Sequence, residues 1–170
     1  PKTLAKQVNR MLADPKGERF VGNFTRIWLE LDNIGKMPPS KEFVSFYRDN
    51  LESAMREETS RLFEHVLGEN LPPVELLSAS YSFLNRELAE HYGMPGLKGN
   101  HFRKVSLPSN ARGGILGHGS FLTASANGVD TSPVVRGIYV MNKLLDYRPP
   151  PPPDDVPAIE PDVRGATTLR

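Results

Sequence analysis

Apolar side chains recur at helical spacing through the first third of the chain. Residues 3–13 carry one such stripe, and residues 18–34 carry a second stripe that is rich in aromatic side chains. The second stripe consists of Phe20, Phe24, Ile27, Trp28 and Leu31. A period of three to four residues is typical of an amphipathic helix. The pattern therefore predicts two helices, separated by the turn-forming Asp14-Pro15-Lys16-Gly17.

A third amphipathic segment runs from Ser40, a candidate N-cap, to about Leu67. Its predicted buried face consists of Leu51, Met55, Leu62, Phe63 and Val66. Its predicted solvated face consists of Glu52, Arg56, Glu57, Glu58 and Arg61, with favourable i,i+4 pairs. We expect one core to hold this buried face together with the aromatic stripe of the second helix, including Trp28.

Shorter elements are predicted further along the chain. Residues 81–91 have the pattern of a short helix, and residues 102–107 alternate in polarity like a short strand. Residues 112–122 are rich in glycine with apolar residues between, which is compatible with a tightly packed helix or with an irregular segment.

The end of the chain carries a strong helix start. A hydroxyl side chain at Thr131 or Ser132 precedes Pro133, so we expect a capped helix over residues 133–145. Its spacing should turn Ile138 and Leu145 inward and leave Lys143 in water.

These elements together predict a mainly α fold. We expect a helical bundle over residues 1–95, and a Gly-rich segment with one further helix packed on it over residues 96–148. Residues 149–170 begin with five consecutive prolines and continue with acidic residues, which indicates a polyproline rod and an extended linker. The first and last residues look like cut ends, so we expect a piece of a larger protein.

Composition narrows the possible functions. The 170 residues are 38% hydrophobic and carry a net charge of +1, so the chain can bury a core but lacks the excess of Lys and Arg typical of nucleic-acid binding. No apolar run approaches the ~18 residues of a membrane-spanning helix. The chain has no cysteine, which excludes disulfides, thiolate nucleophiles and haem attachment within it.

Candidate chemistry is sparse. The four histidines show no metal-binding spacing, and no Gly-x-Ser-x-Gly motif surrounds a serine. His118 is the most unusual histidine, because Gly117 and Gly119 let backbone or a flat ligand come close. It is a candidate ligand or hydrogen-bond donor, or else a packed side chain in a tight turn. We find no self-sufficient active site and lean against an enzyme for this chain alone.

Several motifs are familiar in this order. Glu18-Arg19-Phe20-Val21-Gly22-Asn23-Phe24 comes first, then Ser80-Tyr81-Ser82-Phe83-Leu84-Asn85 with His91-Tyr92-Gly93, then Arg112-Gly113-Gly114, and last Thr131-Ser132-Pro133-Val134-Val135-Arg136-Gly137 before the prolines. Together they resemble the planctomycete-type cytochrome c–associated proteins, in the domain-of-unknown-function families 1592 and 1588.

The resemblance implies an exported protein, periplasmic or extracellular, in which a c-type haem attachment segment follows the prolines. This chain would bind no haem alone, and its partner would be the haem domain of the same polypeptide. Such a haem needs a second axial ligand from elsewhere, for which His118 and Met94 are the candidates. No catalytic residue and no metal site are implied.

Three functions remain open from the sequence. The chain is a non-catalytic helical scaffold that positions the haem domain, or part of an oxidoreductase whose site forms at the junction with that domain, or a carbohydrate- or protein-binding module. The binding module would expose an aromatic platform, for which the candidates are Tyr81, Tyr92, Tyr139 and Tyr147.

Overall fold

A computed structural model describes residues 2–36, 49–109, 112–126 and 132–150. The fold is mainly α, as the sequence predicts. In chain order the elements are α1 (Lys2–Leu12), α2 (Gly17–Trp28), the 3-10 turn η1 (Leu31–Asn33), α3 (Asp49–Gly68), α4 (Glu75–Ser78), β1 (Tyr81–Leu84), α5 (Arg86–His91), β2 (Arg103–Ser106), the 3-10 turn η3 (Ile115–Gly117), α6 (Gly119–Ala124) and α7 (Pro133–Leu144).

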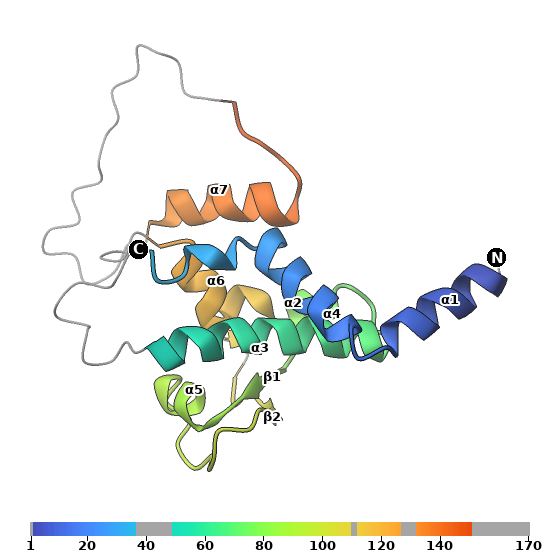
Figure 1. Cartoon of the computed structure of the whole chain (residues 1–170). Coiled ribbons are helices and arrows are strands. Elements are labelled where there is room, and N and C mark those ends of the chain that lie inside the picture. The colour runs from blue at the N-terminus through green and yellow to red at the C-terminus, as the bar shows by residue number, and fades with distance from the viewer. Residues whose placement is uncertain (1, 37–48, 110–111, 127–131, 151–170) are drawn as a thin grey trace, which may run out of the picture.

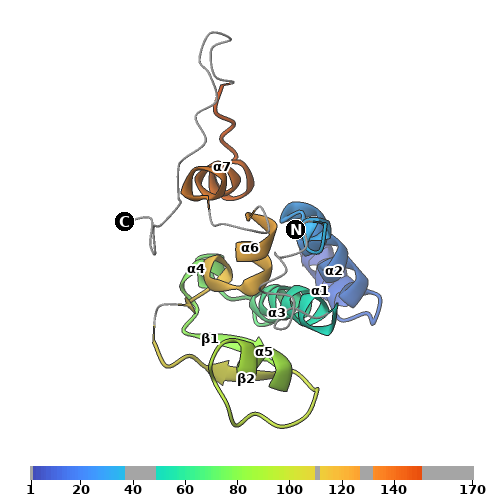
Figure 2. The ribbon, with the colours of Figure 1, turned by 90° about the vertical axis from the view of Figure 1, so that its left-hand side faces the viewer.

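Helix α3 is the centre of the molecule (Figures 1 and 2). It is the longest helix, with 20 residues. Helices α2 and α6 pack along it on one side, and the β1–β2 hairpin-like pair with α5 lies on the other side (Figure 2). Since α3 is covered from both sides, it can carry apolar side chains on more than one face. Among the described residues, no helix is long and apolar enough to cross a membrane.

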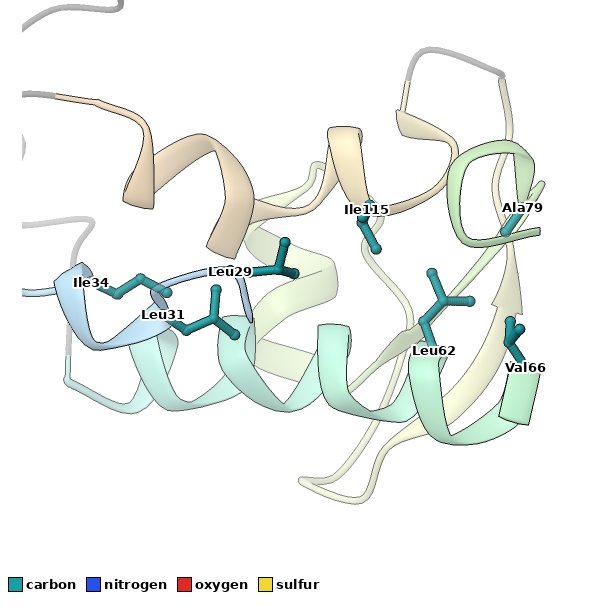
Figure 3. Packing of buried hydrophobic residues seen from close by; sticks show 7 residues of the cluster. All are labelled: Leu29, Leu31, Ile34, Leu62, Val66, Ala79 and Ile115. Carbon is teal, nitrogen blue, oxygen red and sulfur yellow. The ribbon is translucent and has the colours of Figure 1, made fainter. Parts of the chain in front are cut away.

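Two hydrophobic clusters form the core, instead of the single core expected from the sequence. The first cluster joins the end of α2, η1 and the second half of α3, and Figure 3 shows its members: Leu29, Leu31, Ile34, Leu62, Val66, Ala79 and Ile115. The second cluster lies between the first half of α3 and α5, and consists of Leu51, Ala54, Met55, Leu84, Leu88 and Ala89. Leu51 and Met55 therefore do not share a cluster with Leu62 and Val66.

Helix α2 faces α3 through a different side from the one predicted. Val21, Thr25 and Leu29 are buried, whereas Phe20 and Phe24 are exposed. Phe24 stacks on Phe63 of α3 with ring centroids 4.9 Å apart, so the aromatic stripe lies at the edge of the helix contact. Trp28 is half-buried beside the first cluster. The prediction that the whole aromatic stripe of α2 is buried is wrong, because the smaller neighbouring residues Val21 and Thr25 make the buried contact instead.

Residues 81–84 are a strand and not the start of a helix. β1 pairs antiparallel with β2, with Tyr81 opposite Ser106 and Leu84 opposite Arg103. Ser82 and Leu84 are buried, and their neighbours less so, which is the alternation of a half-buried strand. The helix α5 begins only at Arg86, where Asn85 Oδ1 accepts a hydrogen bond from the Leu88 N–H at 2.9 Å. The strand predicted over residues 102–107 is confirmed.

The capped start of α7 is confirmed, but its orientation is not the predicted one. Ser132 Oγ accepts the Val135 N–H at 3.3 Å, and Pro133 occupies the first turn. Tyr139 is the residue buried from α7, and its ring contacts Phe121 with centroids 5.0 Å apart. Ile138 and Leu145 are exposed instead.

Lys143 does not lie in water either. Its ammonium pairs with Glu30, and its carbonyl accepts the Trp28 indole N–H at 2.7 Å. These contacts at the C-terminal half of α7, together with the Tyr139 hydroxyl bonded to the Leu29 carbonyl, set the rotation of the helix. Ser40, Thr131 and residues 151–170 lie outside the described residues.

Candidate functional site

A buried polar network lies beside α3, where four separate elements meet. α3 supplies Glu58 and Thr59, and β1 supplies Ser82. Tyr92 directly follows α5. His118 is the N-cap of α6, and Ser120 lies in the first turn of that helix. Except for half-buried Tyr92, these side chains are buried. We refer to these six residues as the polar network.

Glu58 is the anchor of the network. Its side chain is only 1% exposed. The Ser82 hydroxyl donates to Oε1 at 2.6 Å, and the Tyr92 hydroxyl donates to Oε2 at 2.6 Å. Such short bonds to a carboxylate are charge-assisted and stronger than bonds between neutral groups. Each carboxylate oxygen therefore has a donor, as a buried carboxylate requires.

His118 lies on the other side of the same network. Its Nδ1 is 2.9 Å from Thr59 Oγ1, and Thr59 Oγ1 is in turn 2.6 Å from Ser120 Oγ. Its Nε2 is 3.5 Å from Ser82 Oγ and 3.8 Å from Glu58 Oε1. Burial lowers the pKa of His118 below its usual value, and the nearby Glu58 only partly opposes this effect. The ring is therefore neutral at pH 7.

Tyr92 connects the carboxylate to the start of α6. Its hydroxyl donates to Glu58 and accepts the Gly119 N–H at 2.7 Å. Burial, followed by the charge of Glu58, raises the pKa of Tyr92, so it stays a phenol and keeps its proton. The Arg112 guanidinium lies over the Tyr92 ring, 4.3 Å from its centroid.

The glycines around His118 serve contacts within this chain. A Cβ on Gly117 would lie 2.6 Å from the Arg112 backbone, and a Cβ on Gly119 would lie 2.8 Å from Met55 Cε. The open space that these glycines leave is thus already filled. This geometry fits a packed His118 ring, whose hydrogen-bond partners Thr59 and Ser82 lie on α3 and β1 and not in its own turn.

The other residues singled out in the sequence lie apart from the network. Met94 is half-buried and packs against the second hydrophobic cluster. Ser125, the C-cap of α6, also lies apart from the network: its hydroxyl donates to the Phe121 carbonyl at 2.8 Å and accepts from Arg136 Nε at 3.1 Å. Of the four candidate platform tyrosines, only Tyr147 is exposed, so these four do not make an aromatic platform. The described residues contain no group of three or more His, Asp or Glu that could hold a metal.

Glu58 is the residue that the sequence analysis placed wrongly, on the solvated face of α3. Its spacing from Met55 and Leu62 places Glu58 on the apolar face of α3, and this spacing could have indicated its burial. A carboxylate at such a position is either solvated by a bend or paired with buried donors. The donors come from Ser82 and Tyr92, and nothing in the local pattern of α3 points to them.

Two protein-family models match this chain. The model of the family PSD4, described as a protein of unknown function (DUF1592), matches residues 1–94, and that of PSCyt3, a protein of unknown function (DUF1588), matches residues 112–170. This chain belongs to the PSD4 family. The resemblance to the two cytochrome c–associated families is thereby confirmed. No curated protein and no solved structure matches the chain.

The polar network crosses from one matched region to the other. Glu58, Thr59, Ser82 and Tyr92 belong to the PSD4 region, whereas His118 and Ser120 belong to the PSCyt3 region. Within the network, four hydrogen bonds join the two regions: Thr59 to His118, Thr59 to Ser120, Ser82 to His118, and the Gly119 N–H to Tyr92. The PSD4 region and the start of the PSCyt3 region therefore share one buried interior.

Proposed function

We propose that this PSD4 chain is a non-catalytic helical scaffold of a larger exported protein, and that it positions an adjacent c-type haem domain. The two matched families are named for planctomycete cytochrome c–associated proteins, which supports a haem partner. The periplasmic or extracellular location is part of the same proposal. The haem, when attached to its own domain, supplies electron transfer. The residues of this chain supply rigidity.

One observation carries the proposal. The side chains of the polar network hydrogen-bond to one another, and several of these bonds connect the PSD4 region with the PSCyt3 region. A buried charge and its partners fix the relative placement of segments, because any shift leaves a charged group unpaired away from water. A fixed junction is what a scaffold needs to hold a following domain in one place.

Neither candidate haem ligand, His118 or Met94, lies with a free side chain at the surface. His118 does not fit as it lies, because its ring is buried and Nδ1 is within hydrogen-bond distance of Thr59. Met94 is half-buried in the second cluster. Axial ligation by either residue stays a prediction for the intact protein. The scaffold proposal needs neither of them as a ligand.

A distance measurement in the intact protein tests the positioning. This chain has no cysteine, so Lys98→Cys in an exposed loop adds a single spin-label site within it. We expect a narrow distribution of distances from the label to the haem iron, and a broader one when Glu58→Ala loosens the network. A broad distribution without the Glu58 substitution would contradict the proposal, since the haem domain would then be only tethered.

Absorption spectra of the same protein test the ligand question. An unchanged haem spectrum in both His118→Gln and Met94→Leu would end the prediction of axial ligation and leave only a packing role for these residues. Loss of the low-spin spectrum in either variant would make that residue a ligand. It would favour the alternative in which an oxidoreductase site forms at the junction with the haem domain.

A further inference from the structure

An apolar groove lies between α1 and the beginning of α2, away from the polar network. Its volume is about 450 Å³. Its apolar lining consists of Val8, Met11, Leu12 and Phe20, and the charged residues Arg10, Asp14 and Lys16 lie beside them. The groove forms because Asp14 and Pro15 break the helix and set α1 and α2 at an angle (Figure 1).

The apolar side of α1 is uncovered among the described residues. Leu4 is 71% exposed, Met11 is 62% exposed and Phe20 is 52% exposed. Figure 1 shows α1 projecting away from the rest of the molecule. An isolated helix of 11 residues is only marginally stable in water. Its apolar stripe therefore needs a packing partner to stabilise the helix.

The charge around the groove indicates the kind of partner. Helix α1 carries Lys2, Lys6 and Arg10 and no acidic residue. The sequence of residues 2–19 contains five Lys or Arg residues and two acidic residues. One of the two, Asp14, already accepts the Lys16 backbone N–H at 2.9 Å. The groove is thus apolar at its centre, and its rim carries a net positive charge, from Arg10 and Lys16 against the single carboxylate of Asp14.

We infer that this groove docks an amphipathic helix with an apolar stripe and acidic flanks, contributed by a partner polypeptide segment. Side chains at i, i+3, i+4 and i+7 of such a helix fill an apolar groove, and Glu or Asp beside them complements Arg10 and Lys16. The concave shape between two helices favours an inserted helix over a flat lipid surface. The inference does not depend on the haem partner.

A designed peptide tests the inference. The probe is an 18-residue capped helical peptide with Leu at helical spacing and Glu on both flanks, labelled for fluorescence anisotropy. We expect saturable binding to the full chain, weakened about tenfold or more by Met11→Glu, which places a charge in the apolar centre. Lys6→Glu with Arg10→Glu should also weaken it, and most strongly at low salt.

Matched controls distinguish binding in the groove from non-specific hydrophobic binding. Val74→Glu alters a residue as exposed as Met11, at 62%, outside the groove, and should leave binding unchanged. A peptide with Lys in place of Glu should bind more weakly. No binding, equal binding by the Lys peptide, or equal binding to the Met11→Glu variant would overturn the inference. So would Met11-dependent binding to phosphatidylglycerol vesicles without peptide binding.

Discussion

At the scale of single residues, Glu58 shows how a buried charge is held. Both of its oxygens accept short hydroxyl bonds, from Ser82 and Tyr92. Its neighbour Glu57 is half-exposed and pairs with Arg61 at 2.7 Å on the surface. The two adjacent carboxylates differ only in the side of α3 on which they lie, and this makes Glu57 a natural control.

Glu58→Ala should therefore be strongly destabilising. It removes the acceptor of the buried Ser82 hydroxyl and of the half-buried Tyr92 hydroxyl, and a buried hydroxyl left unpaired costs about 1–3 kcal/mol. We expect a loss of about 2–5 kcal/mol in the free energy of unfolding, measured by urea denaturation. Glu58→Gln should lose less, because its carbonyl still accepts one hydroxyl. Glu57→Ala should stay within about 0.5 kcal/mol of the original protein, and equal losses in the two Ala variants would refute the role of Glu58.

His118 should show its burial in its titration. Its pKa in the folded chain is lowered from the usual 6.5, first by burial. The unfolded chain therefore binds a proton more readily as the pH falls below 6.5, so this residue contributes to stability above pH 6.5 and the contribution is lost below it. NMR of the imidazole should show no titration of His118 near pH 6.5 in the folded chain. An inflection at or above pH 6.5 would contradict the neutral, buried ring.

At the scale of elements, the sequence predicts features that depend on neighbouring residues better than features that depend on distant ones. The cap at Ser132 followed by Pro133 depends on neighbouring residues only, and the structure confirms it. The strand β1 was missed because Tyr81-Ser82-Phe83-Leu84 is short and its partner β2 lies about twenty residues away. Pairing with that distant strand decides the structure of residues 81–84, and the local pattern does not contain it.

The cap at Ser132 also gives a test at this scale. Ser132→Ala removes the acceptor of the Val135 N–H, so we expect a loss of about 0.5–2 kcal/mol in the free energy of unfolding. Ser132→Asp keeps an acceptor and adds a charge that the helix N-terminus favours, so it should restore the stability. Urea denaturation measures both variants. A loss in Ser132→Asp as large as in Ser132→Ala would contradict the capping role.

At the scale of the whole molecule, helix rotation was the property that the sequence could not supply. The spacing in α2 and α7 shows that each helix is amphipathic, but a wide apolar arc leaves the inward direction open. In α7, Tyr139 is buried and Ile138 is exposed, because the Tyr139 ring packs against Phe121 of α6. In α2, Val21 is buried and Phe20 is exposed. The polar network could not be predicted from the sequence either, because its residues come from four separate elements.

The central claim is that the PSD4 region and the start of the PSCyt3 region form one cooperative unit through the polar network. Pulse-labelled hydrogen exchange along a urea titration tests it most directly, because it follows each peptide of the same chain. We expect peptides from α3, from β1 with α5, and from α6 to lose protection at one shared urea concentration. Loss of protection in α6 at a clearly lower urea concentration than in α3 would contradict the claim.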